Sequence, residues 1–291
     1  MDTRLLEYFV AVVEEGGFTR AAERCFVVQS TVSAGIRALE SELGATLFER
    51  TSRRVAPTPA GAALIESARE ALDAVERARG AVTGGVRGRL RVGIFSNLGY
   101  LDLPGLFALF RQRYPSVQLN LTTSPGGTSG LVEELRHGRL DLTFLGIRPE
   151  EVPEFDVAVL RRSPIVAVLP VAHPLADRDR VALAELADEP FVDSPPGFGQ
   201  RRVVERLFDA AGLTRRVTTE VAYVDDVPPF VSAGLGVALL PSELLARDAD
   251  VVAVPLVEPA EWVMSVATRR HPSPAASALR ELMAERLASA D

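Results

Sequence analysis

The sequence of 291 residues contains one cysteine, no lysine and no long apolar run. The single Cys25 excludes an internal disulfide and a cysteine-rich zinc site, so we expect it to be a buried structural thiol. No apolar run approaches the roughly 20 residues that a membrane span requires. The first residues carry Asp2 and Glu7 and lack the basic region of a signal peptide. We therefore expect a cytoplasmic protein with no membrane partner.

Motifs for catalysis are also missing from the sequence. None of the three histidines, His137, His173 and His271, belongs to a catalytic motif. The sequence has no G-x-S-x-G, no phosphate-binding loop and no histidine cluster at metal-ligand spacing. We therefore expect no enzymatic activity, no cofactor and no metal. The alternative from another functional class is an α/β enzyme.

Charge is distributed unevenly along the chain. The formal net charge is −7, but residues 1–89 contain twelve Arg and twelve Asp or Glu. The rest of the chain therefore carries the whole negative excess. An acidic total argues against a nucleic-acid ligand only where charge is spread evenly, so the N-terminal part remains a candidate for binding DNA.

The N-terminal part of the sequence predicts three helices. The first ends at Gly16 and Gly17, where the helical spacing of apolar residues stops. Thr19 is the expected N-cap of the second, with Phe18 before it as a hydrophobic staple. The third helix has one apolar face, which we expect to be buried and which comprises Val32, Ile36, Leu39 and Leu43.

The opposite face of the third helix is polar and built from small side chains. Such a face can approach base edges in the major groove, where Gln pairs with adenine and Ser or Thr contacts several bases. A solvated surface helix is the alternative for this pattern. With Thr19 of the preceding helix, the predicted DNA-contacting residues are Gln29, Ser30, Thr31, Ser33, Ala34 and Arg37.

A basic segment follows the third helix. Arg50, Arg53 and Arg54 precede Thr58 and Pro59, which are typical of the N-cap and first position of a further helix. Cations at the tip of a short strand pair can contact phosphates and add affinity without sequence information. We therefore predict a DNA-binding wing here, and an ordinary solvated loop is the alternative.

The segment from FTRAAERC to TPAG resembles the N-terminal winged helix-turn-helix of LysR-type transcriptional regulators. The resemblance covers about Met1 to Gly61 and rests on AAER, Gln29, Ser33, the I-RALE-ELG frame, LFER and TPAG. Val28 departs from the family, which has Ser or Thr at this N-cap, and loss of such a cap costs about 1 kcal/mol. Gly35 in mid-helix costs up to about 1 kcal/mol more. We therefore expect a recognition helix that becomes firmer on DNA.

A long helix is predicted after Thr58, with an apolar stripe at heptad-like spacing. The resemblance implies that this helix pairs two subunits, whereas packing onto a domain of the same chain is the alternative. Gly84, Gly85 and Gly88 then predict a hinge. The stripe proposed for dimerisation comprises Leu64, Ala68, Ala71, Val75, Ala78 and Val82.

Strand and helix patterns alternate in two series beyond this helix, which predicts a two-lobed α/β domain. The G-LDL and AGLGVALLP stretches resemble the periplasmic-binding-protein-like effector domain of the same family. The expected fold is α+β overall, with a winged helix-turn-helix at 1–58, a linker helix and hinge at 59–88 and an effector domain at 89–291. Lobe I is expected at about 89–161 and 267–291, and lobe II at about 162–266.

Ligands of open α/β sheets bind beyond the carboxyl ends of strands, close to helix N-termini. Hydroxyls and an amide among apolar neighbours suit a small, partly apolar carboxylate. Its charge could be paired by Arg148, Arg201 and Arg202, and the alternative is that these arginines are surface residues. The predicted effector-binding residues are Ser96, Asn97, Thr128, Ser129, Phe144, Gly146, Ser194, Phe198, Gln200, Tyr223 and Val227.

These features together predict a LysR-type transcriptional regulator. Such a protein is expected to bind double-stranded promoter DNA as a homodimer or homotetramer, to respond to a small-molecule effector and to act with RNA polymerase. A related regulator with a vestigial effector site is the alternative within the same class.

Overall fold

The computed structural model describes residues 2–50, 55–83, 85–95, 101–245 and 250–288. The chain divides into two compact units, Met1–Val86 and Arg87–Asp291. Each unit has its own core and is described by itself. None of the described helices is long and apolar enough to cross a membrane.

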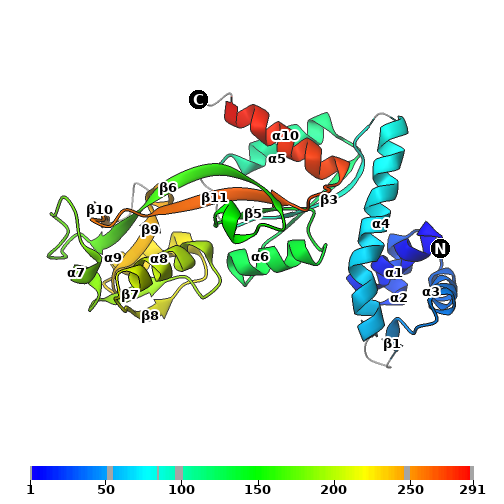
Figure 1. Cartoon of the computed structure of the whole chain (residues 1–291), viewed down its shortest axis with the longest axis horizontal. Helices are drawn as coiled ribbons and strands as arrows, with labels where there is room; N and C mark the ends of the chain where they lie inside the picture. The colour runs from blue at the N-terminus through cyan, green and yellow to red at the C-terminus, as the bar shows by residue number, and fades with distance from the viewer. Residues whose placement is uncertain (1, 51–54, 84, 96–100, 246–249, 289–291) are drawn as a thin grey trace. The chain divides into compact units, whose positions relative to one another are not determined.

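The first unit has the predicted winged helix-turn-helix architecture (Figure 1). Strands β1 and β2 pair in antiparallel register, with Phe48 opposite Pro57 and Arg50 opposite Val55. The elements are α1 (Thr3–Glu15), α2 (Phe18–Arg24), α3 (Gln29–Leu43), β1 (Phe48–Arg50), β2 (Val55–Pro57) and α4 (Pro59–Thr83).

Local chemistry explains where these helices begin and end. The Asp2 carboxylate accepts a hydrogen bond from the Arg4 N–H at 2.9 Å and caps α1. Gly16 and Gly44 adopt the left-handed conformation at φ 61° and 65°, which ends α1 and α3. The Thr58 hydroxyl accepts from the Gly61 N–H at 3.0 Å, so the predicted cap of the long helix is confirmed.

Two sequence predictions in this unit are wrong. Thr19 does not cap α2, because Gly17 is the N-cap and Phe18 is already helical. Leu43 is 42% exposed, whereas Val32, Ile36 and Leu39 are fully buried. Leu43 is the last residue of α3, so no further turn covers its side chain.

The second unit contains a sheet whose strands follow the order β10-β6-β11-β5-β3-β4, with β9 also paired to β6. Strand β3 is parallel to β4 and β5, as expected for α/β connections. Its first elements are β3 (Gly88–Gly93), α5 (Leu103–Arg113), β4 (Val117–Thr122), α6 (Gly127–Arg136), β5 (Leu142–Leu145), η1 (Pro149–Glu151) and β6 (Asp156–Pro170).

Strands β7 and β8 form a separate parallel pair in the second half of this unit. The remaining elements are α7 (Leu183–Leu186), β7 (Pro190–Asp193), α8 (Gly199–Ala210), β8 (Arg216–Glu220), η2 (Val224–Asp226), α9 (Val227–Ser232), β9 (Ala238–Pro241), η3 (Ser242–Leu244), β10 (Val251–Pro255), β11 (Glu261–Thr268) and α10 (Pro274–Ala288).

Two long strands connect the predicted lobes. The first part of β6 pairs with β11, and its last part, from Ile165 to Pro170, pairs with β9 and β10. Figure 1 shows β6 and β11 running side by side between the lobes. The second strand series was expected to begin near Pro164, but β6 passes through this position as one strand of 15 residues. A strand that crosses back and a last helix on lobe I were predicted, and the structure has β11 returning to β5 and α10 in contact with α5 and β3.

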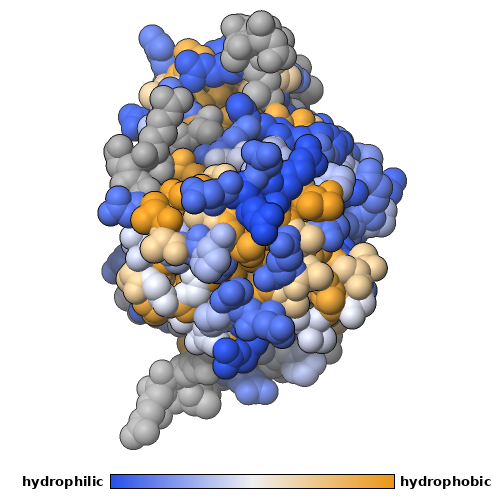
Figure 2. Space-filling view, turned by 90° about the vertical axis from the view of Figure 1, so that its left-hand side faces the viewer, coloured by the Kyte–Doolittle hydropathy of each residue, from blue (hydrophilic) through white to orange (hydrophobic). Residues whose placement is uncertain are grey.

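The free end of lobe II carries a mixed surface. Figure 2 faces this end and shows apolar side chains interspersed with polar ones. Exposed apolar residues of this lobe include Val171, Phe230, Leu235 and Val257. Hydrophilic residues separate the apolar ones in this view, so the described part of this face gives no basis for an interface.

Candidate functional site

The exposed face of α3 is the first candidate site. Burial of Val32, Ile36 and Leu39 directs the other side of the helix outward. Ser33 is half-buried, and its hydroxyl accepts a hydrogen bond from the Gln29 Nε2 at 2.9 Å. Thr19 is exposed on α2. The predicted contact residues exposed on α3 are Gln29, Ser30, Thr31, Ala34 and Arg37.

The start of α3 has no side-chain cap. Val28 occupies the N-cap position with an extended backbone at φ −79° and ψ 149°, and its 66% exposed side chain has no acceptor to offer. Helix α3 begins at Gln29, whose amide donates to Ser33 instead of capping the helix. The expectation of a weak N-terminus therefore has a structural basis.

Gly35 has a different role from the one expected. It is buried, and a Cβ at this position would lie 2.6 Å from Tyr8 Cδ2 of α1. The glycine allows α1 and α3 to pack closely in the core that also contains Phe9 and Ile36. The helix propensity lost at Gly35 is thus exchanged for close packing, and the expected softness of α3 at this residue stays a prediction.

The predicted wing is described only in part. Strands β1 and β2 are in place, but Arg53 and Arg54 lie outside the described residues, as does the side chain of Arg50. The contribution of these three arginines stays a prediction.

The stripe on α4 divides into two parts. Ala68 is buried in the core of the first unit, and Leu64 and Ala71 pack against the same core. Val75 is half-buried, Ala78 is exposed, and the side chain of Val82 lies outside the described residues. The first part of the stripe thus contacts its own domain, which was the alternative interpretation. Dimerisation through the stripe stays a prediction.

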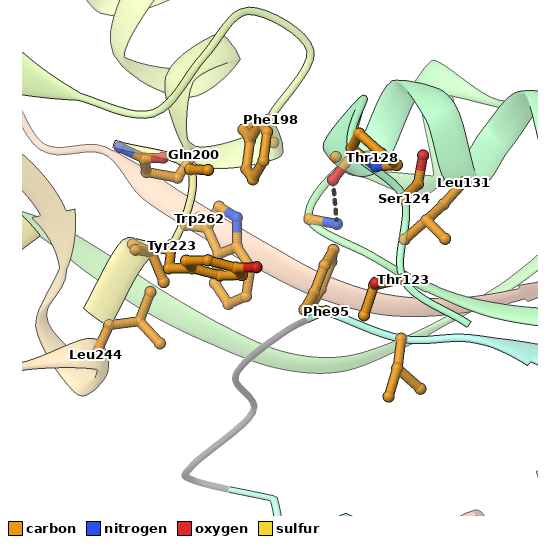
Figure 3. Close-up of a pocket in the computed structure, with 17 residues that line it drawn as sticks. Phe95, Thr123, Ser124, Thr128, Leu131, Phe198, Gln200, Tyr223, Leu244 and Trp262 are labelled. Atoms are coloured by element: carbon orange, nitrogen blue, oxygen red, sulfur yellow. Dashed lines mark hydrogen bonds between the residues drawn. The ribbon is translucent and has the colours of Figure 1, made fainter. Parts of the chain in front are cut away.

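A cavity of about 270 Å³ between the two lobes is the second candidate site. Figure 3 shows side chains of both lobes around one space. Helices α6 and α8 contribute their first turns, β11 contributes Trp262, and the segment after β3 contributes Phe95. The lining residues are Ile94, Phe95, Thr123, Ser124, Pro125, Gly127, Thr128, Leu131, Gly146, Phe198, Gly199, Gln200, Ala222, Tyr223, Val224, Leu244 and Trp262.

The structure brings together some of the predicted effector residues and not others. Thr128, Gly146, Phe198, Gln200 and Tyr223 all line the cavity. The other predicted positions are absent from its described lining. These are Ser129, Phe144, Ser194 and Val227, together with Ser96 and Asn97, which lie outside the described residues.

Structural reasons explain why the four described positions lie outside the cavity lining. Phe144 is fully buried within β5, and Val227 is buried in the core of lobe II. Ser194 is also fully buried. Ser129 contacts the other lobe through its backbone, because its N–H donates to the Gly197 carbonyl at 3.0 Å.

Sequence reasoning missed two aromatic residues of the cavity wall. Phe95 lies two residues after the end of β3, so the rule of strand ends could have identified it. Trp262 belongs to the returning strand β11, and no strand-end rule points to it. The two rings lie 6.3 Å apart between centroids at 49°, a common packing geometry for aromatic side chains.

Glycines allow the lobes to touch through their backbones beside the cavity. A Cβ on Gly199 would lie 2.1 Å from the Gly146 carbonyl oxygen, and one on Gly197 would lie 2.8 Å from that of Gly126. A Cβ on Gly127 would lie 2.7 Å from the Phe198 ring. Larger residues here would separate the walls of the cavity.

A buried polar network lies behind the cavity wall. The Gln200 Nε2 donates to Asp193 Oδ1 at 2.8 Å, and the Ser194 N–H donates to the same oxygen at 2.7 Å. Arg215 forms an ion pair with the other carboxylate oxygen of Asp193. Burial raises the pKa of Asp193 above its ordinary value, and the Arg215 charge offsets this increase only in part.

The arginines near this region are engaged in ion pairs or exposed. Arg202 pairs with Glu151 at 3.0 Å, and Arg201 pairs with Glu205 at 2.8 Å. Arg148 is exposed. None of the three is among the described lining residues, so the described wall of the cavity carries no formal charge.

Comparison with known proteins identifies the family of both units. A family model for the bacterial regulatory helix-turn-helix protein, lysR family, matches residues 3–62, and a model for the LysR substrate binding domain matches residues 83–288. The chain belongs to the LysR family of transcriptional regulators. It is a DNA-binding regulator and not an enzyme, and its C-terminal unit is the effector-binding domain.

Individual relatives match this LysR-type regulator over nearly its whole length. The RuBisCO operon transcriptional regulator of Allochromatium vinosum is 32% identical over 291 residues, covering 96% of this chain and 94% of that protein. Full-length OxyR of Pseudomonas aeruginosa has a TM-score of 0.80 at 25% identity, covering 99% and 94% of the two chains. CbnR, solved in complex with its target DNA, has a TM-score of 0.59 at 26% identity, covering 98% and 99%.

Proposed function

We propose that this regulator reads promoter DNA with the exposed face of α3 and changes its activity when a small molecule occupies the cavity between the lobes. The observation that carries the first part is the division of α3 into a buried apolar face and an exposed face of small polar residues. The solved complex of the relative CbnR with its target DNA supports this use of the fold.

The base-contacting residues in this proposal are the small side chains of α3. Arg50, Arg53 and Arg54 are assigned to phosphates, with Thr19 of α2. The residues assigned to bases are Gln29, Ser30, Thr31, Ser33, Ala34 and Arg37.

Footprinting at several salt concentrations tests this assignment on DNA adjacent to the gene. Ser30→Ala is expected to alter the preference between sequences by about tenfold, since a good base contact discriminates by about 1–3 kcal/mol. Arg53→Ala is expected to weaken all sequences alike and to reduce the salt dependence. A footprint insensitive to salt, or the same effect from both substitutions, would contradict the proposal.

We further propose a homodimer or homotetramer in the cytoplasm, where its DNA lies, with RNA polymerase as a partner. The exposed Ala78 and half-buried Val75 of α4 are not part of the core of the first unit. Their position supports pairing through this part of the helix. Sedimentation of Val75→Glu tests it, because a buried charge without a partner would dissociate a pair formed there. An unchanged oligomeric state would exclude this surface.

The proposed effector contacts are Thr128, Phe198, Gln200 and Tyr223. A carboxylate end is supported by the first turns of α6 and α8 at the cavity wall, because helix N-termini favour anions. A vestigial site is the competing hypothesis. It predicts that no ligand of the cavity changes the footprint on DNA, so footprints recorded with and without a bound ligand separate the two.

A further inference from the structure

The described wall of the cavity is rich in aromatic side chains. Among the described residues, four aromatic side chains contribute to it from separate segments: Phe95, Phe198, Tyr223 and Trp262. Figure 3 shows these rings around a common space. Ring faces and edges attract another ring by offset or tilted packing, which a saturated compound does not reproduce.

The volume suits a small molecule with one substituted ring. A cavity of about 150 Å³ holds benzene. The cavity here, of about 270 Å³, therefore has room for a single ring with small substituents at two ends.

One end of the cavity offers a hydrogen-bond acceptor. Gln200 is 6% exposed, and one hydrogen of its Nε2 is donated to Asp193 Oδ1, which also accepts from the Ser194 N–H. Figure 3 shows the amide nitrogen of Gln200 directed away from Phe198. The second hydrogen of this nitrogen lies on the same side, away from Phe198, so the carbonyl oxygen is the Gln200 atom assigned to a ligand, and an oxygen acceptor needs a donor as its partner.

The other end offers a donor. Thr128, 1% exposed in lobe I, accepts a hydrogen bond from the Gly146 N–H at 3.3 Å. Its hydroxyl hydrogen is left for an acceptor on the ligand. Gln200 of lobe II thus offers an acceptor and Thr128 of lobe I a donor across one aromatic space.

We propose that the ligand of this cavity is a single aromatic ring that carries a hydroxyl or amino donor toward Gln200 and an acceptor such as a carboxylate toward Thr128. This inference rests on the proposed function, in which the cavity takes the effector. It names the chemical class of that effector from the lining residues.

Three probes differ in one feature each and test the proposal on the full chain. 4-Hydroxybenzoate has the ring, the donor and the acceptor, 4-methoxybenzoate lacks the donor, and trans-4-hydroxycyclohexanecarboxylate lacks the aromatic ring. Calorimetry gives their affinities. Trp262 is the only tryptophan of the chain and lines the cavity, so a change in its fluorescence places the binding there.

The expected result is binding of 4-hydroxybenzoate at least about tenfold tighter than either other probe, with a change in Trp262 emission. Gln200→Met is expected to remove the preference for hydroxyl over methoxyl. This preference is the ratio of the affinities for 4-hydroxybenzoate and 4-methoxybenzoate, and a general loss of stability would lower both affinities without changing their ratio. Gln112→Met, an exposed position on α5, is the matched control and should keep the preference.

Equal binding of the three probes, no binding of 4-hydroxybenzoate, or binding without a change in Trp262 emission would overturn the proposal. So would a preference for hydroxyl that survives Gln200→Met. Binding with the expected preference but without a change in the DNA footprint would leave the ligand class standing and refute the effector role.

Discussion

The contact between Gly35 and Tyr8 gives the sharpest test of the packing in the DNA-binding unit. Alanine at position 35 would gain about 1 kcal/mol in helix propensity. Its Cβ would lie 2.6 Å from Tyr8 Cδ2 and 3.2 Å from Cε2. Ordinary carbon contacts lie at about 3.5–4.0 Å, so the tyrosine ring would have to move by roughly 1 Å.

Overpacking of this kind costs about 1–3 kcal/mol. After subtracting the gain in propensity, we expect Gly35→Ala to destabilise the unit by about 1 kcal/mol. Amide hydrogen exchange of peptides from α1 and α3 measures this directly. Their exchange is expected to quicken roughly fivefold where it proceeds by cooperative opening.

A second background makes the reasoning refutable. With Tyr8→Ala the obstacle is gone, so Gly35→Ala is then expected to slow exchange and to stabilise the unit by about 1 kcal/mol. The sign of the effect should therefore reverse between the two backgrounds. Slower exchange in the otherwise native chain would show that helix propensity, and not the contact with Tyr8, decides the residue at position 35.

Three further substitutions test other parts of the molecule. Val28→Ser supplies the missing cap of α3 and should stabilise its first turn by about 1 kcal/mol, and unchanged amide exchange there would contradict the account. Gly199→Ala places a Cβ against the Gly146 carbonyl and should destabilise the C-terminal unit by about 1–3 kcal/mol. The melting temperature is measured by tryptophan fluorescence, and a value equal to that of the native chain would refute the close approach. Asp193→Asn leaves Arg215 as an unpaired buried cation and should cost about 3–5 kcal/mol in urea unfolding. The double substitution with Arg215→Met should recover most of this loss, and additive losses would argue against the pair.

Periodicity was sufficient to predict the part of the fold that depends on one helix at a time. The buried face of α3 followed from spacing alone, apart from Leu43, which fails because the helix ends there. The cap at Thr58 followed from local chemistry. Gly35 could not be interpreted in this way, because its reason is a contact with Tyr8 of another helix.

The cavity shows a related limit. The strand-end rule identifies positions along the chain but not the direction of a side chain. Phe144 satisfies the rule and yet is fully buried within the sheet, whereas Phe198 and Gln200 face the cavity. Trp262 reaches it from a returning strand, and only the order of strands in the sheet places it there.

The backbone contact between the lobes also bears on how a ligand could act. Gly146 of lobe I and Gly199 of lobe II approach so closely that a Cβ on Gly199 would push the two walls of the cavity apart. A ligand held by Thr128 on one side and Gln200 on the other contacts both walls, so its affinity depends on their spacing. If the lobes adopt two arrangements of different spacing, the ligand binds one more tightly than the other and so shifts the balance between them. By reciprocity, DNA that prefers one of these arrangements must change the affinity for the ligand. A ligand confined to one lobe would bind both arrangements equally and would leave DNA binding unchanged.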